Sequence, residues 1–277
     1  MIKAAGQRKK RQERRERSMK YYVVDAFTKE LFAGNPAGIC PVEDWPEERL
    51  MCAIAAENNL SETAFIRKNG EGYDIRWFTP TGEFDLCGHA TLASAFVIMN
   101  FLEPGRRAVD FHSMSGRLRV TREGERYQLD FPARPPRQIG PMALVEQSLG
   151  ARPRGLYLAR DYVALFDTAG QVRALEPDFA LMRRIENCVG LIATAPGDDG
   201  FDFVSRYFAP NDGIVEDPVT GSAHCTLVPF WSERLGKREL VARQVSKRGG
   251  TLYCRDEGER ILIAGDAVLY SIGELAL

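Results

Sequence analysis

The sequence predicts an α+β protein built from two similar halves, each with a sheet curled around one buried helix. The first observation is a repeat: residues 76–80 and 206–210 share an Arg-aromatic-Phe-x-Pro pattern, and each copy continues through a loop carrying an acid to a glycine that opens an apolar helix. The second is that short strand patterns surround these helices. The third is that no GxGxxG or P-loop motif indicates a Rossmann-type fold. With 277 residues, 44% of them hydrophobic, the chain can bury one large core or two ordinary ones.

The first half is expected to open with a strand, a turn and an amphipathic helix. The turn is indicated by Gly34 and the Asn-Pro pair that follows it, which commonly interrupt regular structure. The helix is indicated by Pro46 near its first turn and by an apolar side formed by Leu50, Ala53 and Ile54. In chain order we predict a strand at 21–27, a turn at 34–38, a helix at 46–59, and strands at 63–67 and 73–78.

Two helices are expected to lie in the cores of the two halves. Residues 89–101 are apolar on nearly every side, as in a helix that is buried all round. Residues 222–235 are similar, but Pro229 lacks a backbone N–H and is expected to kink or interrupt the helix. Further strands around these helices are predicted at 117–121, 127–131, 163–166, 191–194 and 261–264.

Charge and proline content divide the chain into segments. Residues 1–18 hold eight Lys or Arg side chains against Glu13 and Glu16, so this N-terminal extension is basic. The whole chain has a net charge of −1, which leaves a net charge of −7 on the remaining residues. Three prolines within residues 131–136 mark a linker. We therefore predict a first domain over 19–135 and a second over 136–265, with a C-terminal strand at about 266–277 that returns to the first domain.

Composition also narrows the class of partner and the compartment. The basic extension has no aromatic residues that could stack on bases, and the rest of the chain is acidic, which argues against a nucleic-acid partner. No run approaches the roughly 18 apolar residues of a membrane span, and no signal-peptide pattern is present, so we expect a cytoplasmic protein without a membrane partner. Six scattered cysteines without CxxC pairs and only three histidines predict no metal site.

Five short blocks occur in order along the chain: 35–38 (Asn-Pro-Ala-Gly), 60–65 (Leu-Ser-Glu-Thr-Ala-Phe), 78–80 (Phe-Thr-Pro), 87–91 (Cys-Gly-His-Ala-Thr) and 216–223 (Glu-Asp-Pro-Val-Thr-Gly-Ser-Ala). Together they resemble the signature motifs of the PhzF family of phenazine biosynthesis-like isomerases. The resemblance covers about residues 19–277 and implies a diaminopimelate epimerase-like fold, in which two pseudo-symmetric domains each form a barrel-like mixed sheet around a central helix. It also implies a homodimer, no cofactor, and a small anionic metabolite bound in the cleft between the domains.

The same resemblance implies the residues of an active site. Glu62 corresponds to the acid/base that takes a proton from one carbon and returns it to another. His89 would help to hold the substrate and position its protons, and Asp217 would orient or share a proton. The positions expected to bind substrate are Ser61, Gly88, Gly221 and Ser222. Independently of the resemblance, glycines that open apolar helices leave backbone N–H groups free for an anion.

Each of these residues also has a purely structural interpretation. Glu62 can be a surface or capping acid, and His89 can be a satisfied core histidine. Asp217 and Ser222 can simply cap the second helix. The other two histidines match no role in the family and are interpreted as structural: His112 and His224.

Two alternatives to this isomerase remain open. Cys87 resembles the first thiol of cofactor-independent racemases and epimerases that use two cysteines, but the second cysteine of that class would stand where this chain has Thr220. Cys225 lies about one turn further into the helix, away from the required place. The other alternative is a metabolite-binding protein without catalysis, which the carboxylate of Glu62 argues against because it would repel an anionic ligand.

Overall fold

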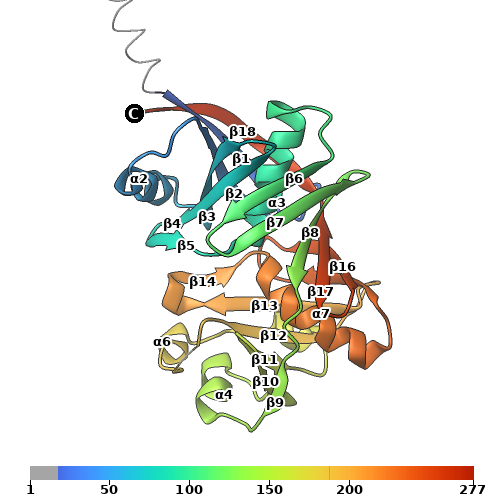
Figure 1. Ribbon diagram of the computed structural model, residues 1–277. Coiled ribbons are helices and arrows are strands. Elements are labelled where there is room, and N and C mark those ends of the chain that lie inside the picture. The colour runs from blue at the N-terminus through green and yellow to red at the C-terminus, as the bar shows by residue number, and fades with distance from the viewer. Residues whose placement is uncertain (1–17, 187) are drawn as a thin grey trace, which may run out of the picture.

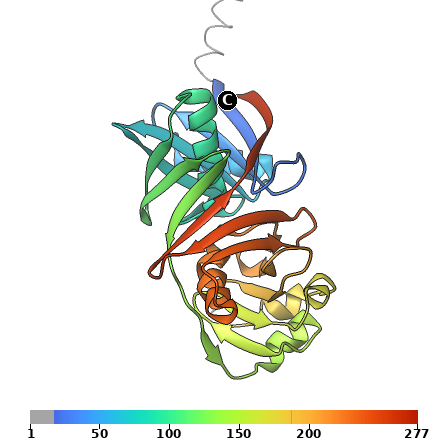
Figure 2. The same cartoon turned by 90° about the vertical axis from the view of Figure 1, so that its right-hand side faces the viewer.

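The computed structural model describes residues 18–186 and 188–277, which form two halves joined by one continuous 18-stranded mixed sheet (Figure 1). The fold is α+β, as predicted. The predicted basic extension lies outside the described residues except for Ser18, which begins the first strand. Seen from the side in Figure 2, the C-terminal strand leaves the lower half and rises along the upper one, where it pairs with that first strand from Ser18 opposite Ala276.

The first half wraps its sheet around the buried helix α3 (Gly88–Val97), which the π-helical segment η1 (Ile98–Leu102) extends. A second helix, α2 (Glu48–Asn58), packs on β3 and β4. The strands of this half are β1 (Ser18–Ala26), β2 (Asn35–Val42), β3 (Glu62–Asn69), β4 (Gly72–Thr79), β5 (Gly82–Phe84), β6 (Ala108–Ser113), β7 (Gly116–Glu123), β8 (Arg126–Pro132) and the returning β18 (Ala267–Ala276).

The second half wraps its sheet around the buried helix α7 (Gly221–Leu235). Its other helices are short: α4 (Ala143–Leu149), α5 (Ala169–Arg173), α6 (Phe179–Met182) and the 3₁₀ turn η2 (Pro210–Asp212). Its strands are β9 (Arg137–Ile139), β10 (Gly155–Leu158), β11 (Tyr162–Leu165), β12 (Leu191–Pro196), β13 (Phe203–Ala209), β14 (Ile214–Asp217), β15 (Glu239–Gln244), β16 (Gly250–Asp256) and β17 (Arg260–Gly265).

The strand pairings repeat between the halves. In the first half β2 is parallel to β3, β3 antiparallel to β4, and β4 parallel to β6. In the second half β11, β12, β13 and β15 repeat this order and these directions. A short strand paired with the central one precedes each buried helix: β5 beside β4 before α3, and β14 beside β13 before α7. The duplication predicted from the sequence is therefore present in the topology, and it gives the two helix N-termini equivalent places.

The repeated Arg-aromatic-Phe pattern makes the same contacts in both halves. Arg76 on β4 binds Glu83 on β5 through two hydrogen bonds of 2.7 and 2.6 Å. Arg206 on β13 binds Glu216 on β14 in the same way, at 2.7 and 3.0 Å. Each guanidinium also lies over the phenylalanine two residues further along its strand. The pattern thus stabilises the pair of strands that leads into each buried helix.

A predicted turn and a predicted helix interruption, both based on proline and its neighbours, do not occur. Residues 35–38, predicted as part of a turn, begin β2, because pairing with β1 and β3 outweighs the local preference of Asn35 and Pro36 for a turn. Pro229 lies inside the continuous helix α7 and does not interrupt it. Tertiary packing overrides the local signal in both places, since α7 lies in the core of its half.

The amphipathic side of α2 also differs from the prediction. The helix begins at Glu48, and it buries Met51, Ile54 and Ala55, whereas Leu50 is exposed. The direction from which β3 and β4 approach the helix decides which of several apolar side chains face the sheet. The sequence pattern alone does not contain that direction.

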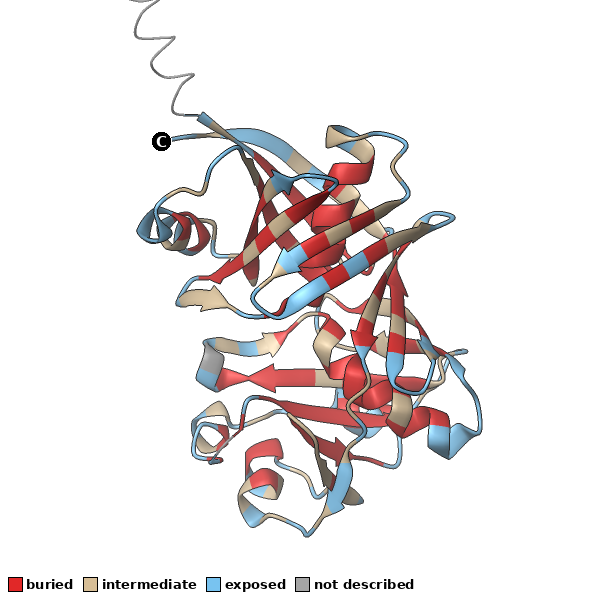
Figure 3. Ribbon diagram, in the orientation of Figure 1, coloured by how far each residue is buried: buried red, intermediate tan, exposed pale blue. Residues whose placement is uncertain are grey.

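Apolar packing places both long helices in the core (Figure 3). Every residue of α3 except Phe96 is buried, and one hydrophobic cluster joins α3, α7 and the strands that connect the halves, including Phe131 of β8 and Ile263 of β17. Because β8 pairs with β7 and with β17, the sheet continues from one half into the other. Among the described residues, no helix is both long enough and apolar enough to traverse a bilayer.

Candidate active site

The N-termini of α3 and α7 meet at the boundary between the halves. A Cβ atom added to Gly88 would lie 3.3 Å from Cα of Gly221, and one added to Gly221 would lie 3.4 Å from Cα of Gly88. Neither helix has a side-chain cap, since the preceding residues, Cys87 and Thr220, make no capping hydrogen bond. Uncapped N-terminal amides and the positive ends of two helix dipoles favour an anion at this place.

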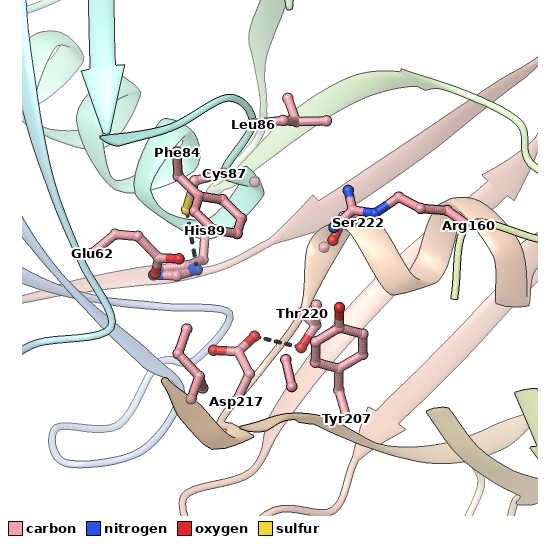
Figure 4. Close-up of a pocket in the computed structure, with 14 residues that line it drawn as sticks. Glu62, Phe84, Leu86, Cys87, His89, Arg160, Tyr207, Asp217, Thr220 and Ser222 are labelled. Atoms are coloured by element: carbon pink, nitrogen blue, oxygen red, sulfur yellow. Dashed lines mark hydrogen bonds and ion pairs between the residues drawn. The ribbon is translucent and has the colours of Figure 1, made fainter. Parts of the chain in front are cut away.

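A cavity of about 40 Å³ lies at this junction (Figure 4). It is lined by six of the seven predicted site residues: Glu62, Gly88, His89, Asp217, Gly221 and Ser222. Glu62 is the first residue of β3 and Asp217 the last residue of β14, so both halves contribute an acid. Ser61, the seventh, is half-buried and is not among the lining residues.

Glu62 and His89 lie side by side at the wall of this cavity. Glu62 Oε2 is 3.1 Å from His89 Nε2, and the two side chains are 7% and 4% exposed. Neither atom makes a hydrogen bond of acceptable geometry to any described residue. The contact is therefore electrostatic, and the carboxylate oxygen and the ring nitrogen both remain able to hydrogen-bond with a ligand.

Asn35, the first residue of β2, connects the two acid-bearing halves. Its amide nitrogen donates to Asp217 Oδ1 at 2.8 Å and to the Val219 carbonyl oxygen at 2.9 Å, and it lies 3.0 Å from His89 Nδ1. Because a carboxylate and a carbonyl only accept, they require the Asn35 nitrogen to face them. The same nitrogen then faces His89 Nδ1, so the neutral form of the ring carries its proton on Nε2, beside Glu62.

The charge state of His89 depends on its two neighbours. Burial lowers the pKa of His89, but negative charge on Cys87 and Glu62 outweighs burial and raises this pKa well above its usual value. The Cys87 sulfur lies 3.5 Å from His89 Nδ1, and burial raises the pKa of this thiol to about 11. Cys87 is therefore an uncharged thiol at neutral pH, and Glu62 is the neighbour that acts on His89 there.

Asp217 is a buried acid with an unusual titration. Burial raises the pKa of Asp217 from 3.8 to about 6, and the charge of Glu62 acts in the same direction, whereas His89 and the hydrogen bonds from Asn35 and Thr220 oppose it. Thr220 Oγ1 donates to Asp217 Oδ2. Both carboxylate oxygens are thus held by side chains, and neither caps α7.

This titration predicts a pH-dependent change in stability. A group whose pKa is raised on folding contributes stability that is fully present below its unfolded pKa and is lost as the pH rises through its folded pKa, here about 6. Wild-type protein should therefore lose this stability as the pH rises, whereas Asp217→Asn, which stays neutral, should not. The free energy of unfolding of the variant, relative to that of wild type, should rise by about 2 to 3 kcal/mol between about pH 4 and about pH 7.5. Urea unfolding at both pH values measures this difference. A difference that is the same at both would contradict the raised pKa.

Comparison with known proteins identifies the family. The profile of the family described as phenazine biosynthesis-like protein, PhzC-PhzF, matches residues 24–273. The chain belongs to this family. An uncharacterized isomerase of Pseudomonas aeruginosa is 50% identical over 261 residues, which cover 94% of this chain and 99% of that protein. The chain is an isomerase of the phenazine biosynthesis-like family.

Solved structures agree with this assignment. The crystal structure of a PhzF-family phenazine biosynthesis protein from Enterococcus faecalis is 47% identical in sequence and superposes with a TM-score of 0.91. The match covers 94% of this chain and 100% of that one. A hydroxyproline epimerase from Agrobacterium vitis shares 12% identity with a TM-score of 0.65, over 95% of this chain and 93% of that one, and so shares the fold alone. The epimerase-like fold predicted for this phenazine biosynthesis-like protein is thereby confirmed.

In this phenazine biosynthesis-like isomerase the two cysteines of the thiol alternative are poorly placed. Cys87 borders the cavity, but the equivalent place before Gly221 holds the hydroxyl of Thr220. Cys225 is buried in the core, where burial raises the pKa of its thiol to about 12. Two protonated thiols, one of them outside the cavity, argue against two-thiol racemisation.

One grouping of three potential metal ligands occurs in the described part of the chain: Glu62, Cys87 and His89, with ligand atoms within 4.8 Å of one another. The carboxylate contacts Nε2 of the ring, whereas the sulfur contacts Nδ1. An ion bound to Nε2 would lie beside Glu62 but on the side of the ring away from Cys87, and an ion bound to Nδ1 would lie beside Cys87 but away from Glu62. The grouping as it stands does not offer three ligands to a single ion.

Four residues of this site were not predicted as functional: Asn35, Arg160, Tyr207 and Thr220. Asn35 stands in a recognised motif but carried a turn signal, and Tyr207 lies in the repeated Arg-aromatic-Phe pattern. Thr220 precedes the helix glycine, as Cys87 does in the other half. Arg160 lies in no motif, so no sequence signal identified it.

Proposed function

We propose that this isomerase moves a proton between two carbons of a small carboxylate-bearing metabolite, with Glu62 as acid/base and without a cofactor. The observation that carries the proposal is the buried Glu62 Oε2, which has no hydrogen-bond partner among the described residues and borders the cavity at the two helix N-termini. His89 Nε2 lies 3.1 Å from this oxygen, but without hydrogen-bond geometry. A buried carboxylate oxygen without a hydrogen bond costs free energy. A proton taken from a substrate would supply the missing partner.

The N-terminus of α7 is the proposed site for the substrate carboxylate. Gly221 and Ser222 line the cavity there, and the backbone N–H groups and the Ser222 hydroxyl would donate to the carboxylate oxygens. When the neighbouring carbon loses its proton, negative charge develops toward this carboxylate. The positive ends of the α3 and α7 dipoles stabilise that charge and so favour removal of the proton.

The proton moves through one carboxylate. Glu62 Oε2 takes it from the first carbon, the C–H electron pair enters the conjugated system of the substrate, and Glu62 returns the proton to the second carbon. His89 Nε2–H lies beside Oε2 and stabilises its negative charge between the two steps. With a pKa of about 6, Asp217 can hold or share a proton near neutral pH, beside the Asn35 amide that also contacts His89.

Proton NMR of pooled carboxylate metabolites in D₂O tests the proposal. Wild-type protein should remove or move one C–H signal of one compound, and Glu62→Gln should leave the same signal unchanged. Equal conversion by both proteins would contradict the role of Glu62. Binding of a compound without any change in its C–H signals would instead support the metabolite-binding alternative.

Replacing Cys87 by alanine separates the proposal from the two-thiol alternative. We expect Cys87→Ala to change the exchange rate by less than about fivefold, because only a weak sulfur contact to His89 Nδ1 is lost. The rate of C–H exchange in D₂O measures this directly. A loss as large as that caused by Glu62→Gln would mean that the thiol, not the carboxylate alone, takes part in proton transfer.

A further inference from the structure

The cavity at Glu62 is too small to hold a whole metabolite. Its volume of about 40 Å³ is far below the roughly 300 Å³ at which small-molecule sites begin. A second cavity of about 360 Å³ adjoins it, and the two share the side chains of Phe84, Leu86 and Arg160. A substrate whose reacting carbons lie beside Glu62 therefore has its remaining atoms in this outer cavity.

The outer cavity combines apolar walls with two guanidinium groups. Its apolar lining comes mainly from the first half and from β8: Phe84, Leu86, Leu118, Phe131 and Pro132. Its positive groups are Arg134, in the segment between β8 and β9, and Arg160, between β10 and β11. The acid that also lines it, Asp85, is exposed at the surface. The lining therefore carries a net positive charge opposite an apolar wall.

Neither guanidinium group donates a hydrogen bond to another described residue, and Arg160 has one ion pair, with buried Asp161. The side chain of Arg134 makes no hydrogen bond or ion pair with the described residues, although its backbone N–H donates to the Cys225 carbonyl and ties the residue to α7. Arg160 lies 3.8 Å from Asp161 Oδ1, beyond hydrogen-bond distance, and that oxygen accepts from the Tyr207 hydroxyl at 3.2 Å. Figure 4 shows the Arg160 side chain extending toward the inner cavity.

We infer that the substrate carries a second carboxylate, which Arg134 and Arg160 bind in the outer cavity while the first carboxylate lies at the helix N-termini. Planar guanidinium groups match the two oxygens of a carboxylate, and a half-buried pair whose N–H groups make no hydrogen bond within the described protein gains most from such a ligand. The apolar wall fits the carbon chain between the two charged ends. This inference rests on the proposed function, since that function places the reacting end of the substrate beside Glu62.

Pairs of simple acids test the second carboxylate by calorimetric titration. The probes are succinate, glutarate and adipate, each compared with its monoamide, which keeps the length and loses one charge. For at least one length, wild-type protein should bind the dicarboxylate about tenfold or more tightly than the monoamide. Arg134→Gln/Arg160→Gln should abolish that difference without weakening the monoamide. Arg137→Gln, an exposed arginine of β9 outside the cavity, serves as the matched control and should keep the difference.

The outcomes separate this inference from the proposed chemistry. The inference would be overturned if wild-type protein bound both members of every pair equally, or bound neither measurably. It would also be overturned if the preference for the dicarboxylate survived in the double arginine variant. Titration of Glu62→Gln should show the same preference for the dicarboxylate, because this protein keeps both arginines. If the preference is found but no Glu62-dependent proton exchange occurs, the second carboxylate site stands and the proposed reaction fails.

Discussion

Replacing Glu62 by glutamine should lower the rate of carbon–hydrogen exchange by about a thousandfold. Glutamine keeps the size of the side chain and its place at the start of β3, but it cannot take a proton from carbon at neutral pH. The remaining groups around the cavity would still bind and polarise the substrate. The expected loss therefore falls mainly on the rate of the chemical step, not on substrate binding.

Single-turnover exchange in D₂O, followed by NMR on the substrate found with wild-type protein, measures this loss. Glu71→Gln provides a matched control, because Glu71 is an exposed acid just before β4 and does not line the cavity. The control should exchange at the wild-type rate. If Glu62→Gln keeps more than about a tenth of the wild-type rate, a different group removes the proton.

Replacing Asn35 by leucine should have the second-largest effect, on stability and on rate together. Leucine has a similar size but no donor, so Asp217 Oδ1 and the Val219 carbonyl lose the hydrogen bonds that join the two halves. A buried acceptor left without a donor costs about 1 to 3 kcal/mol, and we expect a total loss of about 3 kcal/mol in the free energy of unfolding. His89 also loses the amide that faces Nδ1, and a misplaced ring should slow exchange about a hundredfold.

Asn100→Leu separates these two effects of the Asn35 substitution. Asn100 also joins a helix to a strand, since its amide nitrogen donates to the Phe96 carbonyl and to the Tyr127 hydroxyl, but it lies in η1, beyond the end of α3 remote from the cavity. We expect Asn100→Leu to lower stability and to leave the exchange rate of the folded enzyme unchanged. Urea unfolding and exchange rates in D₂O measure both variants. A rate for Asn35→Leu no lower than that for Asn100→Leu would mean that Asn35 does not position His89.

The parts of the fold that depend on local pattern were predictable. Both buried helices were found because a run that is apolar on every side has few alternatives to a core position, and the predicted strands at 63–67, 73–78, 191–194 and 261–264 lie within β3, β4, β12 and β17. The duplication was found because Arg76 and Arg206 begin matching patterns, and both were later seen to bind an acid on the next strand. Each of these signals is contained within a few consecutive residues.

Two of the strands that were not predicted, β6 and β15, pair with a distant strand as well as with the next strand along the chain. β6 and β15 each pair in parallel with the central strand of their half, and such pairing is specified by residues far away in the chain. The start of β2 is the clearest case, since its Asn-Pro pair has a local preference for turns and becomes strand only when β1 and β3 flank it. Local propensity is a weak preference that tertiary pairing overrides.

The sequence by itself determined the duplicated α+β fold, the glycines that open the two buried helices, and the family motifs that carry Glu62, His89 and Asp217. Only the tertiary structure decided that Asn35 joins these groups through one amide, and that Arg160 reaches the same cavity. The physical reason is distance along the chain. A helix start is specified by neighbouring residues, whereas a hydrogen bond between residues 35 and 217 exists only once both halves have folded against each other.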